Sequence, residues 1–562
     1  MLKSFGRLVL CLLLCVAVSP SFAQRLPQGV TAVRSVEGID EYRLANGLQI
    51  LLVPDDSKPT TTVNLTVHVG SRMENYGETG MAHLLEHMLF KGSPNHPAPW
   101  AEFQKRGLAA NGSTAQDRTN YHARFSANPE NLKWYIGWLA DALVHSNVSR
   151  KDLDTEMTVV RNEMESGENR PDSVLLQKLL SVMYDWHNYG KEPIGARADV
   201  ENVDIPRLQA FYRLYYQPDN ATVIVSGRFD PALALQEIAD SFGKIPKPTR
   251  KLPNEYTLDP AQDGERSVTV RRVGGAPLLY AGYHVPAGPD PDFAAVEVLA
   301  IVLGDTPSGR LHKRLTEQGL ASGTFAFGFA LAEPGAFIAG AQLAPGQDIE
   351  KARAALLSVV ESVGREPVTA EELARAKSKY AKSWEQQFTN PETVGIALSE
   401  SIAQGDWRLF FLQRDRVRDV ALADVQRVAE RYLVETNRTL ATYIPTETVV
   451  RAPAPHRVDP VATMKDFKPQ AAAASVEAFD ASPANIDART QRFEVGGLKV
   501  ALLPKGTRGG AVHATLTLRF GDEKSLFGWN DVPDAVASML DKGTATMTRE
   551  QIQDRLDQLR TE

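Results

Sequence analysis

The stretch GETGMAHLLEHMLFKGS, residues 77–93, carries two histidines four positions apart, His83 and His87, with Glu86 between them. Its apolar residues predict a helix. Positions i and i+4 of a helix share one face, so the two imidazoles can point at one centre, at the ~2.0–2.1 Å that zinc requires. Glu86 borders the same face and is suited to be a general base beside a metal. Two histidines can also belong to a solvated face, but the apolar neighbours argue against that here.

A hydrolytic zinc site needs a third protein ligand, because the fourth position is kept for water. The predicted helix DLDTEMTVVRNEMESGENRP, residues 152–171, offers four glutamates. Glu156 and Glu163 are two turns apart and share a face, so one could bind the metal and the other support it from outside. Spacing alone leaves the choice between them open. We expect Glu165 and Glu168 on the solvated side.

Composition is that of an ordinary globular protein, with 43% hydrophobic and 23% charged residues and a net charge of −7 over 562 residues. The length predicts several domains. We find no basic stripe with interleaved aromatic residues and therefore expect no nucleic-acid partner.

The first residues have the pattern of a secretory signal, residues 1–23: two basic residues, an apolar run and a small-x-small site ending at Ala23. Both cysteines, Cys11 and Cys15, fall inside it, so we expect no thiolate ligand and no redox chemistry in the mature chain. The apolar run is too short for a lasting membrane anchor. We therefore expect an exported protein, most simply a periplasmic one.

A hairpin opens the mature chain, since Asn46-Gly47 lies between two apolar runs and predicts a type I′ turn. Strands are predicted at residues 63–69, 111–117 and 119–127, and at Ala221 to Gly227. Helices are predicted at about 129–144 and as one stretch from about 151 to 184. This order indicates an α+β domain, helices packed on a mixed or antiparallel sheet, over residues 35–255. A second domain of the same element order, with no metal site and with helices predicted at 293–303 and 309–318, is expected at 260–445.

An Ala- and Pro-rich stretch, residues 446–486, is typical of a linker. After it the chain repeats its beginning, since RFEVGGLKVALLPKGT at 492–507 matches EYRLANGLQILLVPDD at 41–56. DAVASMLDKGT at 534–544 then matches HLLEHMLFKGS at 83–93, with Asp534, Ala537 and Ser538 where the first copy has His83, Glu86 and His87. We therefore predict two complete units and, at 487–562, the start of a third without the metal-binding residues.

Four linked motifs make the chain resemble the pitrilysin/insulinase family of zinc peptidases, which includes the β subunit of the mitochondrial processing peptidase: GMAHLLEHMLFKGS, NGSTAQDRTNY, VVRNEMES and YYQPDNATVIVSGRFDP. The resemblance covers about residues 40–445 and the repeat after 486. It implies one zinc ion per chain, held by His83, His87 and Glu163, with Glu86 activating water. It also makes Glu156 an outer carboxylate near the metal.

The resemblance further implies that Asn111, Gly112 and Ser113 lie on an edge strand where a peptide substrate adds through backbone hydrogen bonds. Members of the family enclose their substrates between two homologous halves, so a second peptidase-like half, or a homo- or heterodimer partner, is expected. The predicted function is a zinc-dependent endopeptidase acting on peptides or unfolded segments. The alternative is a non-catalytic binding or assembly subunit of a peptidase-like complex, because the oxyanion-stabilising Arg and Tyr of the family are not found in the repeat. His187 is expected at the surface.

Overall fold

The computed structural model describes residues 26–469 and 476–561, and the chain divides into two units with the boundary between Arg451 and Ala452. The predicted signal segment lies outside the described residues, as does part of the predicted linker. Within the described ranges no helix is both long and apolar enough to cross a membrane.

The first half of the larger unit is built on a mixed sheet whose strands run in the order β1-β2-β3-β7-β4-β6-β5. Neighbouring strands are antiparallel except β3 and β7, which are parallel. The central strands are buried on both faces because helices of both halves pack on them. The strands are β1 Val30–Val36, β2 Ile39–Leu44, β3 Gln49–Pro54, β4 Thr60–Val67, β5 Ala109–Thr114, β6 Thr119–Ser126 and β7 Ala221–Gly227.

The predicted hairpin between β2 and β3 is present, but its predicted type I′ turn is wrong. Leu44 and Leu48 close a three-residue loop, and in it only Gly47 has a positive φ, of 104°. A type I′ turn requires positive φ at two successive residues. Asn46 instead directs its side-chain amide to the carbonyls of Phe242 and Ile245, at 2.8 and 2.9 Å. The turn is thus set by a contact with a distant segment of the chain.

Helices cover this sheet much as the sequence predicts, except that one predicted helix is interrupted. The predicted single stretch from about 151 to 184 is two helices, because Pro171 begins a new helix and the residue before a proline is disfavoured in a helix. Strand β1 was not predicted from the sequence, although its residues alternate in burial. The helices are α1 Met81–Leu89, α2 Pro99–Arg106, α3 Pro129–His145, α4 Arg150–Glu168, α5 Pro171–Met183, α6 Arg197–Glu201, α7 Ile205–Tyr215 and α8 Pro231–Ser241.

The second half repeats the α+β plan on a smaller mixed sheet, with strand order β10-β11-β9-β12-β8. A π-helical turn at His312–Thr316 stands where an α-helix over 309–318 is predicted. The strands are β8 Arg266–Val273, β9 Leu278–His284, β10 Gly323–Gly328, β11 Ala336–Gln342 and β12 Arg438–Thr446. The helices are α9 Phe293–Gly304, α10 Ile349–Glu361, α11 Ala370–Phe388, α12 Val394–Ala403, α13 Leu409–Asp419 and α14 Leu422–Tyr432.

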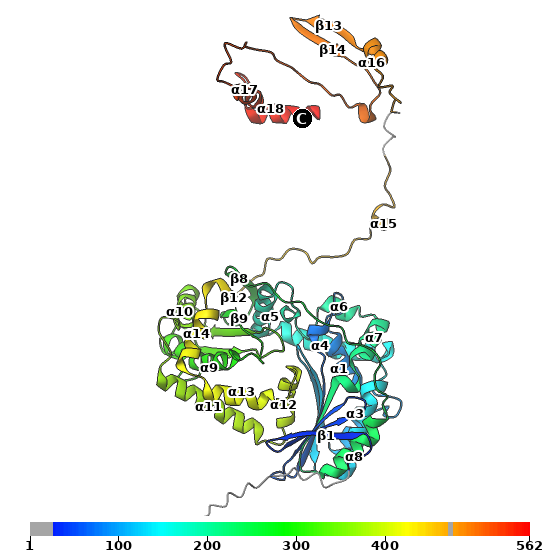
Figure 1. Ribbon diagram of the computed structural model, residues 1–562, viewed down its shortest axis with the longest axis vertical. Coiled ribbons are helices and arrows are strands. Elements are labelled where there is room, and N and C mark those ends of the chain that lie inside the picture. Colours follow the sequence, from blue (N-terminus) through cyan, green and yellow to red (C-terminus); the bar gives the residue numbers. More distant parts are fainter. Residues whose placement is uncertain (1–25, 470–475, 562) are drawn as a thin grey trace, which may run out of the picture. The chain divides into compact units, whose positions relative to one another are not determined.

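The two halves exchange helices. Helix α5, from the first half, packs its leucines on the second sheet beside β8, β9 and β12 (Figure 1). Helix α12, from the second half, packs on β4 and β7 of the first sheet. Each sheet therefore buries one face against the other half, which makes the two halves a single compact unit.

The smaller unit contains a hairpin and short helices whose side chains are mostly exposed. Gly496 and Gly497 both have positive φ, so this turn has the two-residue form that the first hairpin lacks. Helix α17 carries the residues that align with the zinc motif, Asp534, Ala537 and Ser538. The elements are α15 Pro460–Thr463, α16 Pro483–Arg489, β13 Gln491–Val495, β14 Leu498–Leu502, α17 Val532–Met539 and α18 Arg549–Leu559.

Candidate metal centre

Helix α1 has one apolar side, which is buried in the core, and a second side that carries both histidines of the opening motif. Leu84, Leu85 and Met88 are almost fully buried in the first half. The remaining side of the helix faces α4 and β5. His83, Glu86 and His87 lie on that side and are only partly buried, so the helix directs its chemical residues into the space between α1, α4 and β5.

The structure brings His83 and His87 together with Glu163 of α4. Nε2 of His87 lies 3.3 Å from Nε2 of His83, and Oε2 of Glu163 lies 3.3 Å and 3.6 Å from the Nε2 atoms of His87 and His83. In a tetrahedral zinc site with bonds of about 2.0–2.1 Å, neighbouring ligand atoms are about 3.3–3.4 Å apart. The three atoms thus have the spacing of three corners of such a tetrahedron, and the donor set of two imidazoles and one carboxylate suits zinc.

Glu156 holds His87 from behind. Nδ1 of His87 donates to Oε1 of Glu156 at 2.9 Å, and Lys91 pairs with the other oxygen of the same carboxylate. With its proton on Nδ1, His87 keeps the lone pair of Nε2 free to face Glu163 and His83. Glu156 therefore fixes the tautomer that a metal ligand needs.

The two imidazoles have opposite shifts in pKa. Burial, with the nearby charge of His87, lowers the pKa of His83 to about 4. Burial also acts to lower the pKa of His87, but the hydrogen bond to Glu156 and the charge of Glu163 outweigh it and raise that pKa. The bond to His87 and the pairing with Lys91 lower the pKa of Glu156 to about 2. Nδ1 of His83 is buried and has no hydrogen-bond partner among the described residues, so His83 lacks the support at Nδ1 that Glu156 gives to His87.

Glu86 lies beside the histidines but turns toward strand β5. Thr114 donates its hydroxyl proton to Oε2 of Glu86 at 2.6 Å. The carboxylate also packs against Gly112, where an added Cβ would come 2.7 Å from Oε1. Burial raises the pKa of Glu86, which brings a carboxylate closer to the basicity that a proton acceptor needs. Its position and basicity suit a general base rather than a ligand.

Strand β5, which holds Asn111, Gly112 and Ser113, is the end strand of the first sheet as described. The backbone N–H of Ala115 donates to the carbonyl of Arg118, which marks a hydrogen-bonded pair of the β5–β6 ladder. Because such pairs alternate along antiparallel strands, the N–H and C=O of Gly112 point away from β6. A free strand edge therefore runs past Glu86.

Arg118 ties this edge to the second half of the unit. Its guanidinium donates to the carbonyl and hydroxyl oxygens of Ser113, at 3.2 and 3.0 Å. It also pairs with Glu400 of α12, to which its Nε donates at 2.9 Å. The helix exchanged between the halves thus holds the hairpin that carries β5.

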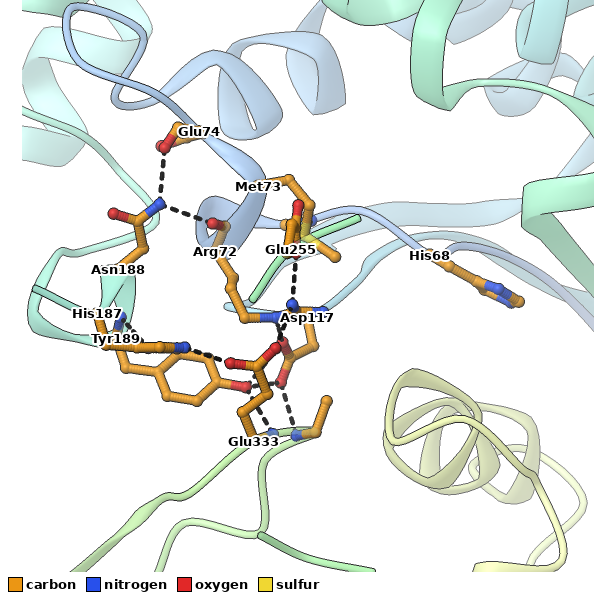
Figure 2. A network of polar contacts seen from close by, with 12 residues as sticks. His68, Arg72, Met73, Glu74, Asp117, His187, Asn188, Tyr189, Glu255 and Glu333 are labelled. Atoms are coloured by element: carbon orange, nitrogen blue, oxygen red, sulfur yellow. Dashed lines mark hydrogen bonds and ion pairs between the residues drawn. The ribbon is translucent and has the colours of Figure 1, made fainter. Parts of the chain in front are cut away.

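A carboxylate at the helix entrance fixes the start of α1. The oxygens of Glu74 accept the backbone N–H groups of Gly80 and Ala82, both at 2.9 Å. The side-chain amide of Asn188 in turn donates to the carbonyls of Glu74 and Arg72, both at 2.7 Å (Figure 2). This arrangement occupies free N–H groups at the N-terminus of the helix.

The same segment is anchored to the second half through a polar network around Arg72 (Figure 2). Arg72 pairs with Asp117, Glu255 and Glu333, at 2.5, 2.5 and 2.9 Å. Tyr189 donates to Asp117, and the backbone N–H of Glu333 donates to the hydroxyl of Tyr189 at 3.1 Å. The entrance to α1 and the β5–β6 turn are therefore joined in one network with the loop of Glu333.

His187 belongs to this network and is buried, which contradicts the expected surface position. Its Nδ1 accepts the N–H of Tyr189 at 3.1 Å, so its Nε2 carries the proton donated to Glu333 at 2.6 Å. Thr114, Lys91 and Arg118 also support the site and were not predicted from the sequence. Lys91 could have been found from its place one turn after His87. No local sequence pattern could have indicated Glu400, because it lies 282 positions from Arg118.

Comparison with known proteins gives matches in two family models. One, described as Insulinase (Peptidase family M16), matches residues 49–197, a range that includes His83, Glu86, His87, Glu156 and Glu163. The other, described as Peptidase M16 inactive domain, matches residues 202–380. A curated relative, Zinc protease PqqE of Helicobacter pylori, is 28% identical over 409 residues, which are 71% of this chain and 91% of that protein.

Solved structures share the fold. A protease from Helicobacter pylori has a TM-score of 0.68 and 26% identity, with 74% of this chain and 99% of that chain covered. The periplasmic protease PqqL from Escherichia coli has a TM-score of 0.62 and 19% identity. In that comparison 84% of this chain covers 56% of PqqL, so the similarity extends over about half of the longer protein.

Proposed function

Because the chain belongs to the insulinase family of metallopeptidases, peptidase family M16, we propose that it is a zinc-dependent endopeptidase. The observation that carries this proposal is the convergence of His83, His87 and Glu163 at the spacing of a tetrahedral site, with Glu86 beside them. The name of its Helicobacter relative, a zinc protease, supports the same activity.

His83, His87 and Glu163 would hold the metal. When bound, zinc acts as a Lewis acid that polarises a peptide carbonyl and makes water a better nucleophile at neutral pH. Glu86 takes a proton from the attacking water and passes it to the leaving amine. Thr114 and Gly112 hold the Glu86 carboxylate in place for this transfer.

A peptide or unfolded segment is the proposed substrate, bound as an added strand along β5. The outward N–H and C=O of Gly112 would pair with its backbone, with Asn111 and Ser113 on either side. Because β5 contacts Glu86 through Gly112, a peptide paired with this edge runs past the proposed base. Recognition of this kind depends on backbone more than on side chains.

We further propose that the protein is exported and acts in the periplasm. This proposal is supported by its structural relative PqqL of Escherichia coli, which is a periplasmic protease. In this proposal the larger unit alone carries the metal site. Helix α17 of the smaller unit has Asp534, Ala537 and Ser538 at the positions that align with His83, Glu86 and His87. A second peptidase-like half, from this chain or from a dimer partner, would complete an enclosing chamber.

Hydrolysis of an internally quenched peptide by the full chain tests the proposal. We expect cleavage that a chelator abolishes and added zinc restores, about one zinc per chain, and a Glu86→Gln variant that keeps zinc but loses cleavage. Absence of chelator-sensitive cleavage in the monomer and in any isolated oligomer would favour the non-catalytic binding subunit instead.

A further inference from the structure

A cavity of about 440 Å³ lies among α9, α11, α12 and α13 in the second half of the larger unit. It does not include His83, Glu86, His87, Glu156 or Glu163, and Glu400, which pairs with Arg118, is the one lining residue already described at the metal centre. The volume is in the range of pockets that hold small organic molecules. Most of its walls are apolar, formed by Phe293, Ile301, Tyr380, Leu409 and Phe410.

One acidic side chain in these walls lacks a partner. Glu297 is the sole charged residue of α9, whose other residues are apolar or glycine. Among the residues that the structure describes, its carboxyl makes no hydrogen bond or ion pair, and burial raises its pKa to about 7. The side chain is partly exposed at the cavity wall, so the carboxyl is surrounded largely by apolar residues and can accept a partner from within the cavity.

A second unsatisfied group lines the same cavity. Both the oxygen and the nitrogen of the Gln413 amide are buried, and neither has a hydrogen-bond partner in the described part of the chain. An amide can accept from a ligand with its oxygen and donate with its nitrogen. Glu297 and Gln413 come from different helices, α9 and α13, and reach the cavity independently.

The other charged groups around the cavity are already paired. Lys379 binds Asp305, and Glu400 binds Arg118 at the metal-bearing half. Glu297 therefore remains as the unmatched charge of the wall when it is ionised. Ser383 and Gln387 also line the cavity and are exposed, which gives a ligand a way in from solvent.

We propose that this cavity binds an organic cation, a single ammonium or guanidinium group on an apolar stem. The cationic head pairs with Glu297 and donates to the amide oxygen of Gln413. The stem packs against Phe293, Tyr380 and Phe410. A metal ion fits less well, because the described residues that could hold one are His83, His87 and Glu163, outside this cavity. The proposal is independent of the peptidase function.

Titration of the full chain with benzylamine tests the proposal, with benzyl alcohol as the neutral probe of the same shape. Binding is followed by calorimetry and by saturation-transfer NMR of the probe. We expect benzylamine to bind, and benzyl alcohol to bind at least about tenfold more weakly, since a hydrogen bond to a charged group is worth about that much. Glu297→Gln should weaken benzylamine binding by a similar factor.

Glu385→Gln is the matched control, because Glu385 lies on the exposed side of α11 and should leave binding unchanged. Gln413→Leu provides a second variant, with weaker binding expected, should Glu297→Gln not fold. The proposal is overturned if benzylamine does not bind, if both variants bind it as the wild type does, or if benzyl alcohol binds equally well. Each of these results would mean that the cavity is filled by water or is only apolar, and that it does not select an organic cation.

Discussion

The carboxylate of Glu86 lies directly on the backbone of Gly112, so closely that a Cβ at residue 112 would come within 2.7 Å of Oε1. Glycine at this position lets the strand edge and the proposed base approach each other. The contact joins the two parts of the proposed site, in which β5 would hold the substrate and Glu86 would move the proton.

Gly112→Ala should therefore displace Glu86 and lower kcat by about 10²-fold, the effect of a misplacement of about 1 Å in a catalytic group. Zinc content should stay at one per chain, because the three atoms nearest an added Cβ at residue 112 all belong to Glu86. The measurement is peptide cleavage together with metal analysis of the purified variant.

Gly137→Ala is the matched control. Gly137 lies in α3 with open space around it, and alanine is the better helix former there. We expect unchanged cleavage and a small gain in stability. Unimpaired cleavage by Gly112→Ala would mean that the Glu86–Gly112 contact has no part in the reaction.

Glu156→Gln should weaken zinc binding by about 10–100-fold, the usual effect of losing the carboxylate behind a histidine ligand. The amide no longer offers His87 a charged acceptor at Oε1. Competition with a chromophoric chelator at fixed pH measures the affinity. Glu165→Gln, an exposed glutamate of the same helix, should bind zinc as the wild type does. Equal zinc affinities for both variants would show that Glu156 does not support zinc binding.

Arg118→Ala should raise KM for peptides several-fold and leave zinc content unchanged. Arg118 holds the carbonyl of Ser113 and pairs with Glu400, so its loss loosens the hairpin that carries β5. Steady-state kinetics separates KM from kcat. Arg124→Ala removes an exposed arginine of β6 as the control. A fall in kcat alone, with KM unchanged, would contradict a role in holding the substrate strand.

Glu297 should make stability depend on pH. Its folded pKa, about 7, lies above the unfolded value of 4.5, so the folded state holds the proton more tightly. Its contribution to stability is fully present below about pH 4.5 and is lost as pH rises through 7. Relative to Glu297→Gln, the wild type should lose on the order of 2 kcal/mol between pH 5 and 8. Melting temperatures of both proteins across this range check it, and parallel profiles would contradict it.

Local patterns in the sequence predicted the α+β fold well. Periodicity located β7 at Ala221–Gly227 and α9 from Phe293, since each is a run of apolar residues in one conformation. Helical spacing placed His83 and His87 on one face. The choice of Glu163 over Glu156 came from the resemblance to the family, because both lie on the same side of α4.

Contacts between distant segments were beyond this kind of prediction. The turn at Asn46 follows from carbonyls 196 and 199 positions away, and the Arg118–Glu400 pair crosses between the halves. His187 can be buried because its ring donates a hydrogen bond to Glu333. No local sequence pattern indicates this contact. The exchange of α5 and α12 has the same origin, since the apolar face of a helix does not reveal which sheet it covers.

Anomalous diffraction at the zinc absorption edge, from crystals of the chain loaded with zinc, tests the account most directly. We predict a single strong peak within about 2.0–2.1 Å of Nε2 of His83, Nε2 of His87 and a carboxylate oxygen of Glu163. Glu156 should remain on Nδ1 of His87 without touching the metal. A peak elsewhere, or one that Glu163 does not reach, would contradict the proposed metal centre and with it the peptidase.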